Sequence, residues 1–495
     1  MPQLFQSYIS PSLPRGVYAV STPPPASITP TGTGNSIAVA QFPWGPAKTL
    51  TYPGSMPAFW ATFAPAGMTR TGGAHLSTIR KGWPSLGGVR VIGPTAAAAT
   101  CVLQTSGAAT VLTLTALYPG TQGNSIIATI AAASDGVSGH YKLTVQVSSA
   151  SGTTTEIYDN NNQTGTGTAA LPNFTGSLLI ASGVAGTNGT IANGATTMSS
   201  GTNGTVAALQ YIGTPGANDY GFALLEADNT IDGIFTDDNS GLSGVNAGLV
   251  AHLAITQDRI GYLSGVAGQT AAQAQTDVAN YRSVNAVYVD PWVMVADDTT
   301  GAISNQPGAC WAASVAAQIP PSLSISARMA TVGNLLRGIS SLEANRSFNK
   351  AANTAAGIAT LIPGNQGGYT FEAGVNTSLV SGQTNLTRTR MGIYIARSAV
   401  NAWYPYVDAP SVPFFQQDLI NSAFSFLSTL RQNSKTNPAV LPYIVNFDMP
   451  VSGLNTAAYI AAGGYDVAAN IQIGANMSRI SLSLTYGETV TIAAT

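Results

Sequence analysis

The sequence is poor in charge. Of its 495 residues, 19 are Lys or Arg and 21 are Asp or Glu, which makes 8% charged, against about 25% in an average soluble domain. Because surface charge keeps monomeric proteins in solution and apart from one another, the deficit indicates a protein that works packed against other molecules, most obviously copies of itself. The net charge of −2 leaves no basic surplus to neutralise phosphates, which argues against a nucleic-acid-binding protein.

Cysteines and long apolar runs are also scarce. Cys101 and Cys310 lie far apart, and we expect two reduced, partly buried thiols, with a disulfide within or between chains as the alternative. No apolar run approaches the roughly 18 residues of a membrane helix. Residues 1–20 carry prolines where a signal peptide needs an apolar stretch. The protein is therefore expected to be made and kept in a cytoplasm.

Residues that could carry chemistry are few. His75, His140 and His252 stand in three separate regions, without metal-ligand or triad spacing. The pairs Asp237–Asp238 and Asp297–Asp298 each precede turn-forming residues and are expected in solvated turns. A calcium loop starting at the first pair would lack its glycine and its final glutamate, and the glycine-rich stretches contain no phosphate-binding motif. The sequence therefore predicts no enzyme, no metal and no cofactor.

The pattern along the chain predicts a multidomain α/β (α+β) protein with a mixed-sheet core and helices on its faces. Strands and helices alternate downstream of residue 205, which indicates a partly parallel sheet. The predicted parts are an N-terminal extended arm (1–30), a first core part (31–94), an inserted β-rich domain (95–204), a second core part (205–464) and a C-terminal strand arm (465–495).

Local patterns place individual elements in these parts. Period-two alternation or buried apolar runs predict strands, and apolar stripes with caps predict helices. The expected strands are 36–42, 89–92, 109–117, 141–147, 153–158, 260–263, 286–289, 443–447 and 470–473. The expected helices are 245–258, 270–281 and one starting at Pro413, whereas 187–204 is expected to be a loop.

Both ends of the chain carry strand-like segments that look detachable. The strand at 16–20 is too short to bury itself, and residues 479–486 alternate strictly between apolar and polar side chains. Two exposed edge strands on one chain favour strand addition between subunits. The residues predicted to make these inter-subunit contacts are Val17, Tyr18, Val20, Ile471, Ile473, Ile480, Leu482 and Leu484.

Positive charge gathers at two places. Arg388, Arg390 and Arg397 form the densest spot, which is interpreted as a solvated or salt-bridged face or as a charged interface contact. Arg431 and Lys435 lie near the end of the helix from Pro413, where they suit the helix dipole or could face an acidic partner.

The order of short motifs resembles that of the tail sheath proteins of contractile phage tails and related injection systems. The family's Pro-Gly-Val-Tyr opening is similar to Pro14–Tyr18, with Arg15 inserted, and its strand before Pro-Trp is similar to the stretch ending in Pro291-Trp292. The long helix from Pro413 and the alternating C-terminal arm follow in the family's order. The other matching stretches are 37–46, 83–92, 118–125, 200–204, 218–220 and 374–376.

The resemblance implies a mechanical function. Family members stack as hexameric rings around an inner tail tube, join neighbours through their terminal strands, and contract on a baseplate signal to drive the tube through the target envelope for genome delivery. It further implies tube, baseplate and tail terminator proteins as partners, a virion location after assembly in the host bacterial cytoplasm, and neither nucleic-acid binding nor membrane insertion. Arg388, Arg390, Arg431 and Lys435 would be possible tube-facing or interface charges.

Two alternatives remain open from the sequence. A capsid, surface-layer or adhesin-like protein would share the low charge but would form arrays that do not contract. A polysaccharide-processing virion enzyme would need two carboxylates about 5–10 Å apart in a cleft, and the sequence offers only the turn-like aspartate pairs.

Overall fold

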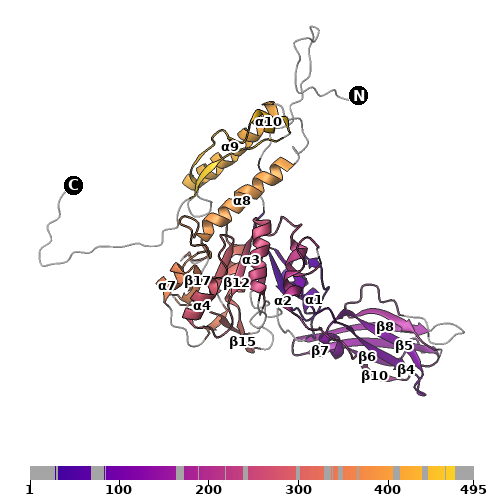
Figure 1. Cartoon of the computed structure of the whole chain (residues 1–495). Helices are drawn as coiled ribbons and strands as arrows, with labels where there is room; N and C mark the ends of the chain where they lie inside the picture. The colour runs from indigo at the N-terminus through magenta and orange to yellow at the C-terminus, as the bar shows by residue number, and fades with distance from the viewer. Residues whose placement is uncertain are drawn as a thin grey trace, which may run out of the picture.

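The computed structural model describes most of the chain between Ile28 and Ile473 (Figure 1). The described residues are 28, 32–68, 83, 85–162, 172–187, 189–217, 219–237, 244–296, 301–327, 336, 338–343, 349–364, 367–404, 413–436, 444–462 and 464–473.

A mixed sheet forms the centre of the molecule. Eight described strands lie in the order β18 (Tyr369–Phe371), β17 (Ile358–Pro363), β13 (Ala286–Asp290), β12 (Ile260–Ser264), β11 (Gly233–Thr236), β1 (Asn35–Ala40), β3 (Ser85–Arg90) and β2 (Leu50–Thr51). The six inner strands are parallel and the two outer ones antiparallel. All five positions of β12 and of β13 are buried, as expected for parallel strands covered on both faces. The predicted mixed-sheet core is confirmed.

Helices cover both faces of this sheet. On one face, α5 (Gly308–Gln318) and α1 (Met56–Phe63) pack with Val287 and Val289, whereas α3 (Val245–Thr256) and α4 (Ala271–Val278) pack on the face of Ala286 and Tyr288. These neighbouring strand positions point to opposite faces because side chains alternate along a strand. The second face also carries α2 (Ala208–Ile212) and the turn η3 (Gly221–Leu225), and α7 (Lys350–Ala355) packs beside β17.

Local sequence explains where several helices begin. The Thr270 side chain accepts a hydrogen bond from the backbone of Gln273, so the predicted cap of α4 is confirmed. In helix α8 (Leu386–Trp403), Asn385 accepts hydrogen bonds from the backbone N–H groups of Thr387 and Arg388. Helix α9 (Pro413–Thr436) starts at Pro413 as predicted, because proline fits the first turn of a helix.

The inserted region consists of two antiparallel sheets. One contains β10 (Gly194–Thr197), β6 (Ile127–Ala132), β7 (His140–Ser149) and β8 (Gly152–Asn162); the other contains β4 (Ala98–Gln104), β5 (Thr110–Pro119) and β9 (Ile180–Ala185). The turn η2 (Thr121–Ser125) joins them, and they enclose an apolar core of their own. The predicted pairing of 141–147 with 153–158 is confirmed. The predicted loop at 187–204 is wrong in part, because it contains β10.

Helices α8 and α9 form a C-terminal unit with β19 (Ile444–Asp448), α10 (Ala457–Ala461) and β20 (Asn470–Ile473). Figure 1 shows α8 running from the central sheet to α9 and α10, at the end of the molecule opposite the inserted sheets. Strands β19 and β20 pair antiparallel. A further small sheet of β15 (Ile303–Gln306), β14 (Val293–Ala296) and β16 (Ile339–Leu342) lies against the central core.

Both cysteines are buried, and they form no disulfide with each other. Burial raises the pKa of the Cys101 thiol to about 11 and that of Cys310 further still, so both thiols stay protonated and poorly reactive at neutral pH. Within the described part of the chain, no helix is both long and apolar enough to cross a membrane.

Candidate functional site

Of the two aspartate pairs, the structure describes only Asp237, and it does not place this residue in the solvated turn that was predicted. Asp237 is only 4% exposed, and its carboxylate accepts hydrogen bonds from the Tyr211 hydroxyl at 2.7 Å and from the Gln41 backbone N–H at 3.0 Å. The prediction is therefore wrong for Asp237, which is a buried structural residue. Asp238 and the pair Asp297–Asp298 lie outside the described residues.

The histidines are not brought together. His140 lies in the inserted region, where its Nδ1 is 2.6 Å from the Asp135 carboxylate. His252 is buried on α3, and burial, with a smaller effect of the Arg259 charge, lowers its pKa to about 4. His75 lies outside the described residues. Among the residues that the structure describes, no three His, Cys, Asp or Glu side chains are grouped so that they could hold a metal ion.

The densest positive spot of the sequence binds the chain's own backbone. Arg390 donates hydrogen bonds to the carbonyls of Leu323, Ala316 and Ile319, which follow or end helix α5. Arg388, on the same helix α8, donates one hydrogen bond to the Gly382 carbonyl. The structure thus directs Arg390 into the core rather than to a solvated face.

Arg397 also anchors α8 to the core. Its guanidinium is 7% exposed, pairs with Asp232 at 2.5 Å, and donates to the carbonyls of Ile231 and Asp258. The sequence left open whether these arginines form a solvated or salt-bridged face or a charged interface contact. Arg397 forms a salt bridge within the chain. On α9, Arg431 is partly buried, and Lys435 lies in the last turn.

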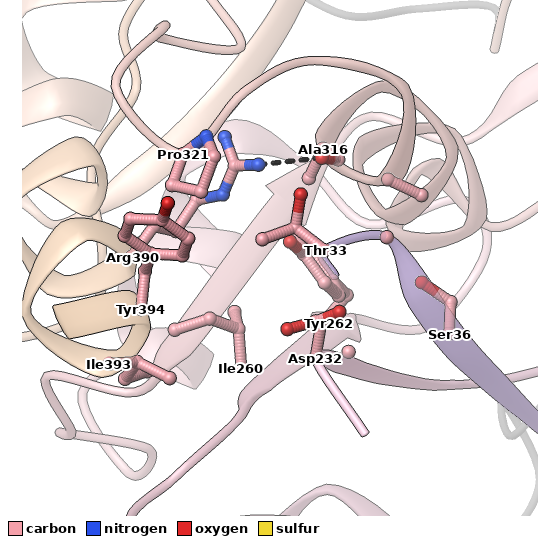
Figure 2. Close-up of a pocket in the computed structure, with 13 residues that line it drawn as sticks. Thr33, Ser36, Asp232, Ile260, Tyr262, Ala316, Pro321, Arg390, Ile393 and Tyr394 are labelled. Atoms are coloured by element: carbon pink, nitrogen blue, oxygen red, sulfur yellow. Dashed lines mark hydrogen bonds between the residues drawn. The ribbon is translucent and has the colours of Figure 1, made fainter. Parts of the chain in front are cut away.

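A small cavity lies where α8 meets the central sheet (Figure 2). Its volume is about 30 Å³, and Arg390, Ile393 and Tyr394 of α8 face Tyr262 and Asp232 of the core across it. The segment that leads into β1, at Thr33 and Gly34, lines the same cavity. The segment before β1 and helix α8 therefore meet at the inner strands β1, β11 and β12 of the sheet.

Ile28 brings the N-terminal segment to the C-terminal unit as well. It is 7% exposed and belongs to the apolar cluster between α8, α9 and β19. Residues from both ends of the sequence thus share one hydrophobic core, which the sequence patterns did not indicate. The other members of the cluster include Met391, Ile395, Ala423, Phe426, Leu427, Leu430 and Ile444.

The predicted arm residues fall into two groups. Val17, Tyr18, Val20, Ile480, Leu482 and Leu484 lie outside the described residues. Ile471 and Ile473 lie in β20, which pairs with β19 of the same chain, and both pack against the cluster between α8 and α9. This corrects the prediction that the strand from 470 is part of a detached arm, because its apolar side chains complete the chain's own core.

The hairpin of β19 and β20 offers an open surface. The described sheet has only these two strands, so no other described strand lies along the outer edge of either one. Large apolar side chains are exposed in the same C-terminal unit, namely Val400, Tyr404, Phe424, Val445, Val451, Leu454 and Tyr459. A two-stranded hairpin in a unit with exposed apolar side chains is typical of a surface that binds another protein segment.

No protein-family model matches the chain, and no curated protein matches it in sequence. Solved structures do match it. A sheath tail protein from Desulfitobacterium hafniense aligns with a TM-score of 0.61 and 16% identity, over 88% of this chain and 93% of the other. A sheath tail protein from Listeria innocua aligns with a TM-score of 0.57 and 16% identity, over 82% and 86% of the two chains.

An assembled sheath matches over an even larger share of the chain. The helical sheath of the anti-feeding prophage, in its contracted state, aligns with a TM-score of 0.55 and 13% identity over 97% of this chain and 99% of the other. The inserted sheets and the C-terminal unit are therefore largely within the region aligned with this sheath. The chain has the fold of the tail sheath proteins.

Proposed function

We propose that the chain is the structural subunit of a contractile sheath, which stacks in hexameric rings around an inner tail tube. The observation that carries this proposal is the likeness of nearly the whole chain to sheath proteins, including one in an assembled helical sheath. The low charge of the sequence supports it, because subunits with few charges can pack closely without repelling one another.

Strand exchange through the C-terminal unit would hold neighbouring subunits together. The predicted strand at 479–486 has Ile480, Leu482 and Leu484 on one face, and an incoming strand of this kind could pair along the β19–β20 hairpin, at an edge that no other described strand occupies. Its apolar face would then extend the apolar layer that Ile471 and Ile473 form against α8 and α9. The short strand around Val17–Val20 is proposed for the same kind of pairing.

Contraction in this proposal is a switch between two packings of the same subunits. Strand tethers keep neighbours connected while the contacts between central domains change. A signal from the baseplate releases the extended state, and the shortening sheath drives the tube through the target envelope to deliver the genome. The subunit performs no covalent chemistry, its partners are tube, baseplate and terminator proteins, and it assembles in the host cytoplasm before it becomes part of the virion.

Electron microscopy of the purified full chain tests the proposal, with and without a candidate tube protein. Hollow tubes with sixfold symmetry are expected. A variant ending at residue 473 keeps β20 but lacks the predicted arm, and it should remain folded by circular dichroism and monomeric by light scattering. Tubes formed by this shortened variant would contradict the proposed strand exchange.

The alternative is a subunit of a virion or surface array that does not contract. It rests on the same low charge and open hairpin, which suit any self-assembling protein. Micrographs that show flat sheets or closed shells, and never tubes, would favour it over the sheath.

A further inference from the structure

Asp232 stands where the segment before β1 and helix α8 meet the inner strands of the central sheet. It directly precedes β11 and lines the cavity under α8. We call Ile28 with residues 32–35 the N-terminal base; Thr33 and Gly34 line the same cavity as Asp232, and Asn35 is the first residue of β1.

One oxygen of the Asp232 carboxylate holds the N-terminal base. Oδ2 accepts a hydrogen bond from the Asn35 backbone N–H at 2.9 Å, and the Asp232 N–H donates to the Asn35 carbonyl at 2.8 Å. The Asn35 side chain donates in turn to the backbone carbonyl and hydroxyl of Thr230. The first residue of β1 is thus fixed by four hydrogen bonds to the segment before β11.

The other oxygen holds α8. Oδ1 accepts from Arg397 Nη1 at 2.5 Å, and Nη2 of the same guanidinium donates to the carbonyls of Ile231 and Asp258 at 2.6 Å each. Arg390, seven residues earlier, lies on the same face of α8 and binds the carbonyls at the end of α5. Arg397 is therefore the second of two anchors that fix α8 to the central domain.

We infer that Asp232 is a positioning residue that couples the N-terminal base to α8. A single carboxylate bridges the two segments. A displacement of α8 that breaks the ion pair between Arg397 and Asp232 therefore also disturbs the carboxylate that accepts the Asn35 N–H. The packing of Ile28 against Met391 and Ile395 adds a second link between the same two segments. The purpose of this coupling rests on the proposed function. In a sheath whose subunits are joined through both terminal strands, the two strands would need to start from one rigid part of the subunit.

Hydrogen exchange of the full chain tests the coupling without reference to assembly. Arg397→Gln removes the partner of Oδ1 and touches neither Asn35 nor Thr230, yet it should raise amide exchange at residues 33–36 by about tenfold. Asp232→Asn should raise exchange both there and in α8. If Arg397→Gln does not fold, Arg397→Lys is the second variant. It keeps the positive charge but loses the planar guanidinium that binds several acceptors at once, and it should give a smaller rise in exchange at the same amides.

Asp258→Asn is the matched control. The Asp258 side chain is similarly exposed and pairs with Arg259, whereas Arg397 binds only the backbone carbonyl of Asp258, which the substitution keeps. The control should leave exchange at residues 33–36 unchanged. Exchange at residues 33–36 that stays at the original rate in Arg397→Gln, or that rises equally in Asp258→Asn, overturns the coupling.

Microscopy of the same variants separates this inference from the proposed function. If the original chain forms tubes, those of Asp232→Asn should vary more in subunit spacing than those of Asp258→Asn. If the original chain forms no tubes, the sheath proposal fails, while the exchange result still decides whether Asp232 couples the two segments.

Discussion

Arg390 Nη2 lies 2.6 Å from the carbonyl oxygen of Ala316, and this contact fixes helix α8 to the end of helix α5. The last carbonyls of a helix have no partner within it and carry partial negative charge. A guanidinium offers several donors in a fixed plane, so it can bind Ala316, Ile319 and Leu323 together. Arg390 thus attaches the C-terminal unit to the central domain, whereas the sequence left open a contact between this arginine and a partner protein.

Replacement of Arg390 should weaken the whole fold. Arg390→Met keeps much of the side-chain length but removes every donor, which leaves three carbonyls without this partner. A loss of about 3 kcal/mol in the free energy of unfolding is expected, measured by urea denaturation. Arg388→Met is the control on the same helix, with a single hydrogen bond to Gly382 and an expected loss of about 1 kcal/mol. Equal losses in the two variants would contradict the anchoring role.

Asp237 should matter for stability although its sequence context suggested a turn. Asp237→Ala leaves the Tyr211 hydroxyl and the Gln41 N–H without their acceptor in a buried place, and a loss of about 2–4 kcal/mol is expected from denaturation curves. Tyr211→Phe keeps the bond from the Gln41 N–H to Asp237 but removes the hydroxyl that donates to Asp237 and accepts from Gln41 Nε2, so it should cost about 1–2 kcal/mol. A loss for Asp237→Ala no greater than that for Tyr211→Phe would indicate that the carboxylate does not hold both groups.

Acid should destabilise the protein through His252. Its pKa is about 4 in the folded chain, because burial disfavours the charged ring, and about 6.5 in an unfolded chain. The unfolded state therefore binds the proton first, so stability falls as the pH drops from about 6.5 to 4 and then changes no further from this group. The expected loss at pH 4 is about 3 kcal/mol.

Denaturation at pH 7 and pH 4 measures this effect. His252→Leu should remove most of the difference attributed to the histidine. An unchanged pH dependence in His252→Leu would show that other groups cause the acid sensitivity.

The elements that the sequence predicted correctly have local signals. β12, β13, α3 and α4 follow from apolar runs, helical spacing and the Thr270 cap, all of which lie within a few neighbouring residues. Helix α5 was missed because nearly all of its residues are buried and none is charged, so it shows no contrast between a polar and an apolar face.

No local sequence signal indicated helix α8 or the buried position of Asp237. The arginines of α8 suggested a charged surface, but their partners are backbone carbonyls far away in the sequence, and any residue can supply a carbonyl. Asp237 is likewise held by Gln41, which directly follows β1 and lies 196 residues earlier in the sequence. The placement of Ile28 between α8 and α9 depends on the whole fold and could not be deduced from its neighbours.

Gly221 should tolerate no side chain. It has φ +45°, and an added Cβ would lie 1.8 Å from the Tyr211 carbonyl oxygen, a backbone atom that cannot rotate away. Gly221→Ala should therefore lower the free energy of unfolding by more than about 3 kcal/mol, or prevent folding. Gly216→Ala is the control, because Gly216 also has positive φ but has open space around it, and the backbone strain alone costs about 1 kcal/mol. Thermal unfolding of both variants checks the difference.

Val445 tests whether the open hairpin is the surface that joins subunits. Its side chain is 53% exposed on β19, so Val445→Lys should leave the unfolding free energy nearly unchanged. A lysine there would place a charge where an added strand buries apolar area, which should raise the concentration needed for polymerisation by about tenfold or more. Val184→Lys is the control, since Val184 is 61% exposed on β9 of the inserted region. Sedimentation of polymer over a concentration series gives the threshold for each variant, and an equal shift in both would argue against the hairpin as the joining surface.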